Sequence, residues 1–219
     1  MSNMEEQIKR DILDALYWDN RVNASNITVE VESDEASLSG SVPSFVARRA
    51  AEEDALSTPG IYWVNNDISV QYPIPDVPTD MEIQAFIENM YLWNTSIESS
   101  KIAVRVNKGI VSLKGTVGSL WEMARAEDLA DDVIGVMEVV NGLAVVPTES
   151  YLDEQIAKRI TNAFERSIVI NVHKVTVSIK NGKVTLSGKV SSWFGRNRAQ
   201  YITMFTAGVT SVENLITVK

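Results

Sequence analysis

The sequence predicts an α+β protein made of three tandem αββαβ domains, each a small mixed three-stranded sheet packed on two helices. Three sets of equally spaced residues carry this prediction. A Leu-x-Gly-x-Val pattern occurs three times, at Gly40, Gly115 and Gly188. A second glycine follows each of these by twenty residues and an asparagine by a further six, at Gly60, Gly135, Gly208, Asn66, Asn141 and Asn214. Because the three copies align without a gap, an internal repeat organises the whole chain.

The domain limits follow from this repeat. We place the three domains at residues 1–72, 79–146 and 150–219 of the 219-residue chain. Prolines 73, 75, 78 and 147 lie between them and mark the linkers. Units of this size are close to the lower limit for an independent core, and without cysteine no disulfide can support them.

Each domain is expected to open with a helix. The candidate capping pairs are Ser2/Glu5, Thr79/Glu82 and the weaker Ser150/Asp153. Apolar residues one helical turn apart follow in every copy, as at Ile8, Ile12 and Leu16. This spacing is that of a helix with one buried face.

Two strands joined by a tight turn come next. The first strand of each domain begins at Ile27, Ile102 or Val175 and alternates apolar with polar residues, which predicts a sheet with one buried face. Gly109 and Gly182 suit a turn with positive φ, and Asp34 takes that place in the first domain. In the second strands, the glycines at 40, 115 and 188 point inward, where we expect them to let a helix backbone approach the sheet closely.

A second helix is predicted over residues 44–57, 119–133 and 192–207. The glycines at 60, 135 and 208 suit the C′ position of these helices. A third strand, parallel to the second, then ends each domain.

The net charge is unevenly distributed. The whole chain carries −9, but residues 1–76 carry −9, residues 77–148 carry −5 and residues 149–219 carry +5. An acidic chain is repelled by polyanions, so nucleic acid is an unlikely partner. The basic third domain is suited to an anionic partner, or to docking on the acidic domains of the same or another chain.

This pattern resembles the BON domain family of bacterial osmotically inducible, nodulation-related and outer-membrane-associated proteins. The residues that carry the resemblance are the two glycine series and the three asparagines given above, in all three copies. The resemblance implies the αββαβ fold and a non-enzymatic binding role, most often toward phospholipid or membrane surfaces, in osmotic stress or envelope maintenance. It implies no catalytic residue and no cofactor.

The residues themselves also predict no catalysis. The single histidine, His173, has no cysteine or second histidine to form a zinc site or a nucleophile–base pair. The carboxylates at 127, 128, 131 and 132 lack the spacing of a calcium loop and are expected to form a solvated helix face. We therefore expect no metal site and no enzyme activity.

The candidate binding site is the start of the second helix in the third domain. Trp193, Phe194, Arg196 and Arg198 combine aromatic and cationic side chains with free helix N–H groups, a combination suited to an anionic surface. Trp193 has an additional structural interpretation, because Phe45 and Leu120 at the equivalent positions are apolar. The arginines are expected to attract the surface and Phe194 to insert into it.

The leading hypothesis is attachment to anionic phospholipid through the third domain. The alternative is a protein-interaction module whose open sheet faces, bearing Ala144, Val146 and Leu215, pack on a partner. Tyr62 and Trp63 have no apolar counterparts of their size in the other copies and form either an inter-domain contact or an exposed patch. No apolar run is long enough to span a bilayer, and the polar N-terminus predicts a cytoplasmic location, or a periplasmic one if a leader has been removed.

Overall fold

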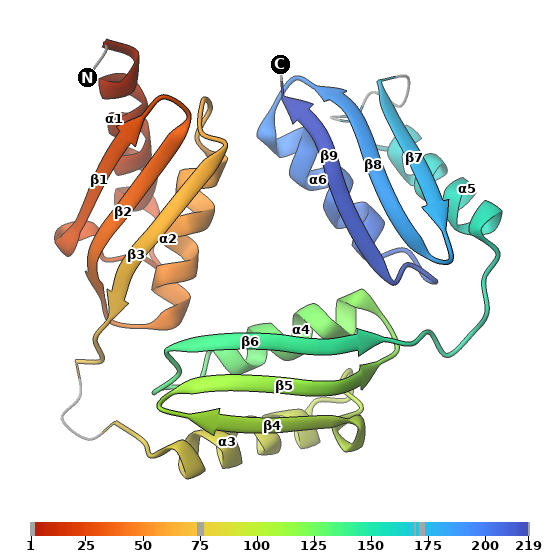
Figure 1. Ribbon diagram of the computed structural model, residues 1–219, viewed down its shortest axis with the longest axis horizontal. Coiled ribbons are helices and arrows are strands. Elements are labelled where there is room, and N and C mark those ends of the chain that lie inside the picture. The colour runs from red at the N-terminus through yellow and green to blue at the C-terminus, as the bar shows by residue number, and fades with distance from the viewer. Residues whose placement is uncertain (1–2, 74–76, 169, 171–173, 219) are drawn as a thin grey trace. The chain divides into compact units, whose positions relative to one another are not determined.

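The computed structural model describes residues 3–73, 77–168, 170 and 174–218 (Figure 1). Its α-helices are α1 (Asn3–Trp18), α2 (Phe45–Ser57), α3 (Asp80–Trp93), α4 (Leu120–Asp131), α5 (Asp153–Glu165) and α6 (Trp193–Met204). Its strands are β1 (Ile27–Glu32), β2 (Glu35–Val42), β3 (Trp63–Val70), β4 (Ile102–Asn107), β5 (Ile110–Val117), β6 (Glu138–Val145), β7 (Val175–Lys180), β8 (Lys183–Val190) and β9 (Ser211–Val218). Short 3₁₀ turns, η1 (Ala24–Asn26) and η2 (Ser99–Lys101), precede β1 and β4. The predicted αββαβ order is confirmed in all three copies.

Each domain contains its own three-stranded sheet. The strand orders are β1-β2-β3, β4-β5-β6 and β7-β8-β9, so the second strand of each domain is central. In the first and third domains the hairpin strands pair antiparallel and the last strand pairs parallel to the central one. The predicted mixed sheets are therefore present.

Helices cover one face of each sheet (Figure 1). In the first domain, α1 buries Ile8, Ile12 and Leu16, as its apolar spacing predicts. Strand β1 alternates buried and exposed residues along its length. The second face of the sheet is consequently left to the polar residues of the strands.

Small residues on the second helix allow it to lie close to the sheet. Ala51, Ala126 and Ala199 occupy equivalent positions in α2, α4 and α6, and all three are fully buried. The expectation that the strand glycines provide this close approach was therefore wrong. The helix itself provides it, through side chains no larger than a methyl group.

The strand glycines have a different purpose. Gly40 adopts φ +118°, and a Cβ at this position would lie 1.9 Å from the carbonyl oxygen of Asn26. Gly115 and Gly188 adopt similar angles and would meet the carbonyl oxygens of Lys101 and Lys174 at 2.0 Å. The glycine is thus required because the carbonyl of the residue that precedes the first strand lies against the second strand at this point.

The later glycines have positive φ but are not helix C′ residues. Helix α2 ends at Ser57 with Thr58 as its C-cap, so Gly60 lies in the following turn. A Cβ on Gly60 would lie 2.9 Å from Cδ1 of Ile8 on α1. Gly135 and Gly208 face Ile83 and Ile156 in the same way. These glycines let the turn pack directly on the opening helix.

The hairpin turns differ between domains. Both central residues have positive φ in the second and third domains, at Lys108, Gly109, Asn181 and Gly182. In the first domain positive φ occurs at Ser33, not at Asp34 as predicted. The first turn therefore shares positive φ at the first central residue, equivalent to Lys108 and Asn181, and lacks it at the second.

The three asparagines join the second helix to the last strand. Asn66 Nδ2 donates to the carbonyl of Arg48 at 3.1 Å, and its Oδ1 accepts from Ile68 N at 3.2 Å. Asn141 and Asn214 make the same pair of hydrogen bonds in their domains. This repeated contact explains why an asparagine occurs at the same position in all three copies.

The predicted capping pair Thr79/Glu82 is confirmed. Glu82 accepts from Thr79 N at 2.8 Å, and Thr79 Oγ1 accepts from Glu82 N at 3.4 Å. Ser2 lies outside the described residues. In the third domain the helix begins at Asp153 with Leu152 as N-cap, not at Ser150 as the weak capping pair implies, because Gln155 Oε1 accepts from Leu152 N at 3.4 Å.

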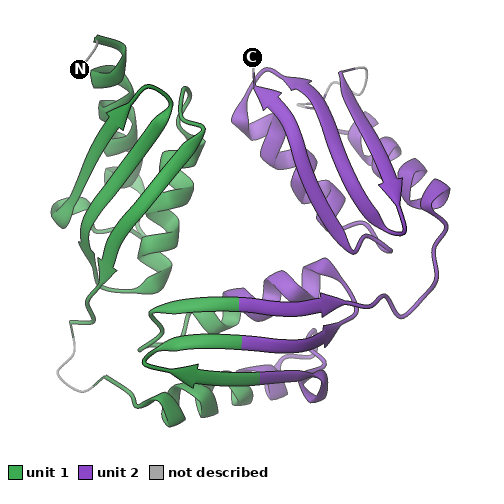
Figure 2. Ribbon diagram, viewed as in Figure 1, with its two compact units in different colours: residues 1–89, 104–112, 129–140 green, residues 90–103, 113–128, 141–219 purple. Residues whose placement is uncertain are grey.

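Contacts between Cα atoms gather the chain into two compact units (Figure 2). The first contains residues 1–89, 104–112 and 129–140, and the second contains the rest. The boundary crosses the strands of the middle domain.

Candidate functional site

The start of α6 is a regular helix N-terminus. Ser192 is its N-cap, with extended backbone and an Oγ that accepts from Gly195 N at 3.1 Å. Ser44 caps α2 in the same way, through Ala47 N at 3.2 Å. The serine cap therefore sets the start of α6 at Trp193, and all four predicted binding residues lie in the first two turns of this helix.

Two of those four residues are partly buried. Trp193 is half-buried, and the guanidinium of Arg196 lies 5.0 Å from its ring centroid. Arg196 also donates to the carbonyl oxygens of Asn214 and Ile216, both at 3.1 Å. Desolvation lowers the pKa of Arg196 from its usual value. Arg196 therefore binds backbone carbonyls of the edge strand β9, a structural contact that the sequence did not predict.

The first domain repeats this contact and the second does not. Arg48, equivalent to Arg196, donates to the carbonyl of Asn66 on β3 at 3.0 Å. The second domain has Met123 at this position. An arginine that covers the open carbonyls of an edge strand is therefore an optional structural feature of these domains.

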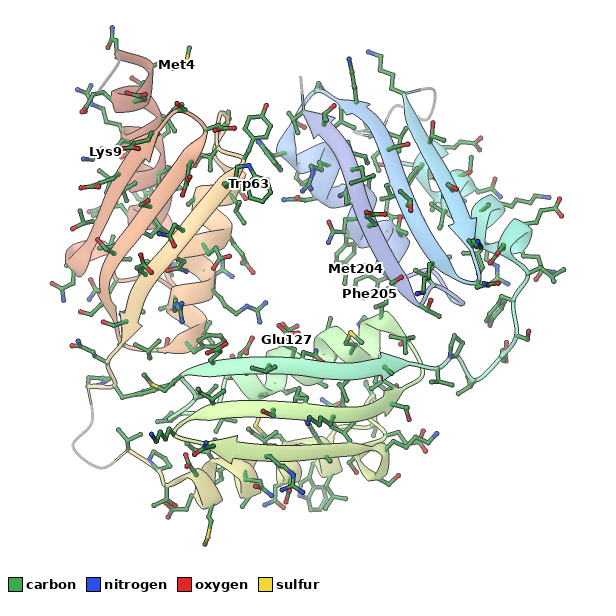
Figure 3. The ribbon with its side chains drawn as sticks, in the orientation of Figure 1. Met4, Lys9, Trp63, Glu127, Met204 and Phe205 are labelled. Atoms are coloured by element: carbon green, nitrogen blue, oxygen red, sulfur yellow. The ribbon has the colours of Figure 1, made fainter. Side chains whose placement is uncertain are left out.

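The other two residues are exposed on one side of α6. Phe194 is 66% exposed, and Arg198 lies one helical turn further along, also exposed. The series continues with Tyr201 and Phe205, which are exposed as well. Figure 3 shows Phe205 at the end of α6. We call Phe194, Arg198, Tyr201 and Phe205 the α6 stripe.

Ring contacts connect the members of the α6 stripe. The Arg198 guanidinium lies 5.4 Å from the centroid of the Tyr201 ring. The Tyr201 and Phe205 rings are 4.3 Å apart and tilted by 33°. Sequence reasoning missed Tyr201 and Phe205, although their spacing of i+7 and i+11 from Phe194 is the signal that would have found them.

The α6 stripe occurs in the third domain alone among the three copies. The equivalent residues are Val46, Ala50, Glu53 and Ser57 in α2, and Trp121, Arg125 and Asp128 in α4 with Asp132 directly after it. Both of those helices carry acidic residues on this face, whereas α6 contains none along its whole length. Helix α4 shares an aromatic residue and an arginine at the first two positions, but only α6 continues with two aromatic rings in place of carboxylates.

The predicted patch in the first domain is also exposed. Trp63, labelled in Figure 3, begins strand β3 and is 70% exposed, and Tyr62 before it is exposed as well. For the alternative hypothesis, Ala144, Val146 and Leu215 are all exposed at the last strands of their domains. These side chains are accessible for contacts with another molecule.

The described residues contain no group of three or more histidine, cysteine or carboxylate side chains arranged to hold a metal ion. In the acidic cluster, Glu127 accepts from Asn141 Nδ2 at 2.8 Å and Asp131 pairs with Arg49. His173 lies outside the described residues. In the part of the chain that is described, no helix combines the length and the hydropathy needed to cross a bilayer.

A hollow of about 600 Å³ lies where α5 meets the hairpin turn of the third domain. Its lining includes Tyr151, Asp153, Gly182 and Gly208. The Asp153 carboxylate is already occupied, because it accepts from Asn181 N and Gly182 N at 2.8 and 2.9 Å. The carboxylate of Asp153 therefore holds the hairpin turn at the edge of this hollow.

Comparison with protein families and solved structures gives one clear result. The model of the BON domain matches residues 5–72, 79–147 and 152–219. Among the curated proteins no match is found. Two structures of CdsD, a structural protein of the type III secretion system of Chlamydia trachomatis, are similar at 14% and 13% identity. The matches cover 96% and 97% of this chain and 96% and 92% of theirs, with TM-scores of 0.27 and 0.28.

Proposed function

Because this chain belongs to the BON domain family, with three tandem copies, we propose that it is a non-enzymatic protein that attaches to anionic phospholipid surfaces through α6. The observation that supports this proposal is the α6 stripe. It places two phenylalanines, a tyrosine and an arginine on the exposed side of one helix, within residues 149–219, whose net charge is +5. Neither acidic domain has this arrangement.

The chemistry of the α6 stripe suits a membrane interface. Aromatic rings partition into the boundary between headgroups and acyl chains, and tyrosine keeps its hydroxyl in water while its ring is buried. An arginine close to an anionic bilayer contributes about 1 kcal/mol of attraction. Arg198 supplies this attraction, and the neighbouring rings supply apolar area. Arg196 supports the fold instead, since its guanidinium is committed to β9.

Vesicle co-sedimentation tests the proposal. We expect the full chain to bind vesicles containing phosphatidylglycerol and not vesicles of phosphatidylcholine alone, and to bind less as salt screens the charges. Arg198→Ala should weaken binding about fivefold at low salt. The matched control is Arg125→Ala, which removes the equivalent arginine of α4 and should leave binding unchanged.

Phe194→Ser tests the apolar part of the attachment. This substitution should weaken binding at low and at high salt alike, because the hydrophobic contribution is not screened. Absence of binding by the wild-type chain, or equal losses in Arg198→Ala and Arg125→Ala, would contradict attachment through α6. Either outcome would favour the alternative, a module that binds another protein.

A further inference from the structure

The second face of each sheet is not covered by a helix of its own domain (Figure 1). Strand alternation and pairing determine which side chains lie on this open face. In the first domain they are Thr28, Glu30, Glu32, Glu35, Ser37, Ser39, Ser41, Trp63, Asn65, Asp67 and Ser69. In the third domain they are Thr176, Ser178, Lys180, Lys183, Thr185, Ser187, Lys189, Ser211, Glu213, Leu215 and Thr217. We call these sets the acidic face and the basic face.

The two faces carry opposite charge. The acidic face has four carboxylates, Glu30, Glu32, Glu35 and Asp67, and no lysine or arginine. The basic face has three lysines and one carboxylate, Glu213, which accepts from Thr185 Oγ1 at 3.2 Å. The corresponding face of the middle domain is mixed, with Arg105, Lys114 and Glu138. Only the terminal domains are therefore strongly charged on this side.

The charges concentrate at the same place in the two hairpins. Glu32 lies directly opposite Glu35, and Lys180 lies directly opposite Lys183, at equivalent positions of the repeat. All four side chains are exposed, and none has an ion-pair partner within the described residues. Like charges directly across a strand pair repel each other. If the glutamate pair met the lysine pair, the repulsion within each pair would be relieved.

Each face also has an exposed apolar side chain. On the acidic face Trp63 is 70% exposed and pairs in register with Glu35. On the basic face Leu215 is 54% exposed and pairs with Ser187. Ser211 and Asp67 occupy the reciprocal positions, so each apolar residue is a feature of one face only. A contact between the two faces would bury both apolar side chains among complementary charges.

We propose that the acidic face of one chain binds the basic face of a second copy of this chain. One chain carries one face of each kind, so the contact is heterologous and joins copies head to tail. A three-stranded sheet of this length covers only about 15 by 25 Å. Contacts this small are weak, so the assembly depends on protein concentration and is lost at high salt. This contact lies on the side of the sheet opposite α6 and does not depend on the proposed lipid attachment.

Sedimentation velocity of the full chain without lipid tests the proposal. The wild-type chain should form larger species as concentration rises at low ionic strength, and these species should dissociate at high salt. Glu32→Lys/Glu35→Lys gives both hairpins a pair of lysines at these positions, and Lys180→Glu/Lys183→Glu gives both hairpins a pair of glutamates. Each variant alone should remain monomeric. Because each reversal only replaces one like-charged pair by another, the internal repulsion of the hairpin is retained.

An equimolar mixture of the two variants provides the decisive measurement. Each hairpin pair then meets a pair of opposite charge on the other variant, so the mixture should regain the large species of the wild-type chain. Recovery also shows that both variants are folded. Arg105→Glu, on the open face of the middle domain, is the control and should associate like the wild type. Arg198→Ala should also associate normally, which separates this contact from the lipid surface.

Three outcomes would overturn the proposal. A wild-type chain that stays monomeric at every concentration at low salt has no such contact between copies. The same result would be obtained if the two faces bound each other within one chain. Association that survives either charge reversal shows that another surface is responsible. A mixture that fails to associate shows that the two faces do not recognise each other.

Discussion

At the residue scale, one carboxylate connects the opening helix to the hairpin turn in the second and third domains. Asp80 accepts from Lys108 N and Gly109 N at 2.7 and 2.9 Å. Asp153 makes the same two hydrogen bonds to the turn of the third domain. In the first domain the equivalent Glu5 accepts from Ser33 N at 3.3 Å. In every domain, amides of the hairpin turn thus donate to a carboxylate of the opening helix.

We predict that Asp153→Ala lowers the free energy of unfolding of the third domain by about 1–3 kcal/mol, since two hydrogen bonds to a charged acceptor are lost. The matched control is Glu154→Ala, which removes the adjacent exposed carboxylate. Urea unfolding of both variants measures the difference. Equal stability of the two variants would show that the turn does not depend on this carboxylate.

Asp54 makes stability depend on pH. Its Oδ2 atom is buried without a hydrogen-bond partner, and burial, followed by the charge of Asp19, raises the pKa of this carboxyl to about 6. Arg21 opposes the shift and Glu53 adds to it. The pKa of the folded state thus exceeds the unfolded value of 3.8, so the folded state binds the proton more tightly. This contribution is present at low pH and is lost as pH rises through 6.

We predict that Asp54→Asn melts at a higher temperature than the wild type at pH 8. The difference should shrink as pH falls through 6 toward 4, because the wild-type carboxyl then becomes neutral as well. Thermal unfolding across this range measures it. Asp67→Asn, an exposed position in the same domain, is the control. A constant difference between Asp54→Asn and wild type at every pH would contradict titration of Asp54 in this range.

The sequence predicted which residues matter to the fold better than it predicted which atoms those residues contact. Spacing alone located the three asparagines and the strand glycines, because a repeat marks every residue that the fold requires three times. It could not assign Arg196 to the carbonyls of β9, because an arginine beside aromatic residues has the same pattern in a binding site and in a structural contact. The difference depends on the direction of one side chain, which only the packed helix determines.

At the element scale, the close contact between the second strand and the residue that precedes the first strand depends on the glycine of the second strand. We predict that Gly115→Ala lowers the free energy of unfolding by at least about 1–3 kcal/mol, because the new methyl group would meet the Lys101 carbonyl and φ is +133°. Gly118→Ala is the matched control three residues away, where the nearest atom to a Cβ is Glu122 Oε2 at 3.5 Å. Thermal unfolding compares them. Equal melting temperatures would mean that the backbone at residue 115 can move away without cost.

The elements themselves were predictable, and their ends less so. Apolar periodicity located six helices and nine strands, because one face of each element is buried in the small core of its own domain. The second helices end earlier than predicted in α4 and α6, at Asp131 and Met204. The glycine that was taken for a C′ residue instead shapes the turn that packs on Ile83 or Ile156. A positive-φ glycine has the same sequence signature in both places.

At the scale of the whole molecule, side chains of the first domain contact the segment 129–140 within one compact unit. Tyr72 Oη donates to the carbonyl of Val136 at 2.6 Å, and Arg49 pairs with Asp131. Asp131 is buried, and its Oδ1 has no hydrogen-bond partner. Sequence reasoning could not find these pairs, because the repeat predicts each domain separately and contains no information on which faces of different domains meet.

We predict that Arg49 and Asp131 are energetically coupled by about 1–2 kcal/mol. A buried carboxylate that loses its cation is costly, but Arg49 is about one-third exposed, so solvent screens part of the interaction. The measurement is a double-mutant cycle of Arg49→Met and Asp131→Asn by urea unfolding. The cycle of Arg49 with the exposed Glu53 at 3.8 Å is the control and should give less than about 1 kcal/mol. A coupling of zero between Arg49 and Asp131 would show that the first domain and the segment 129–140 do not associate in solution. The first domain would then unfold independently of the other two.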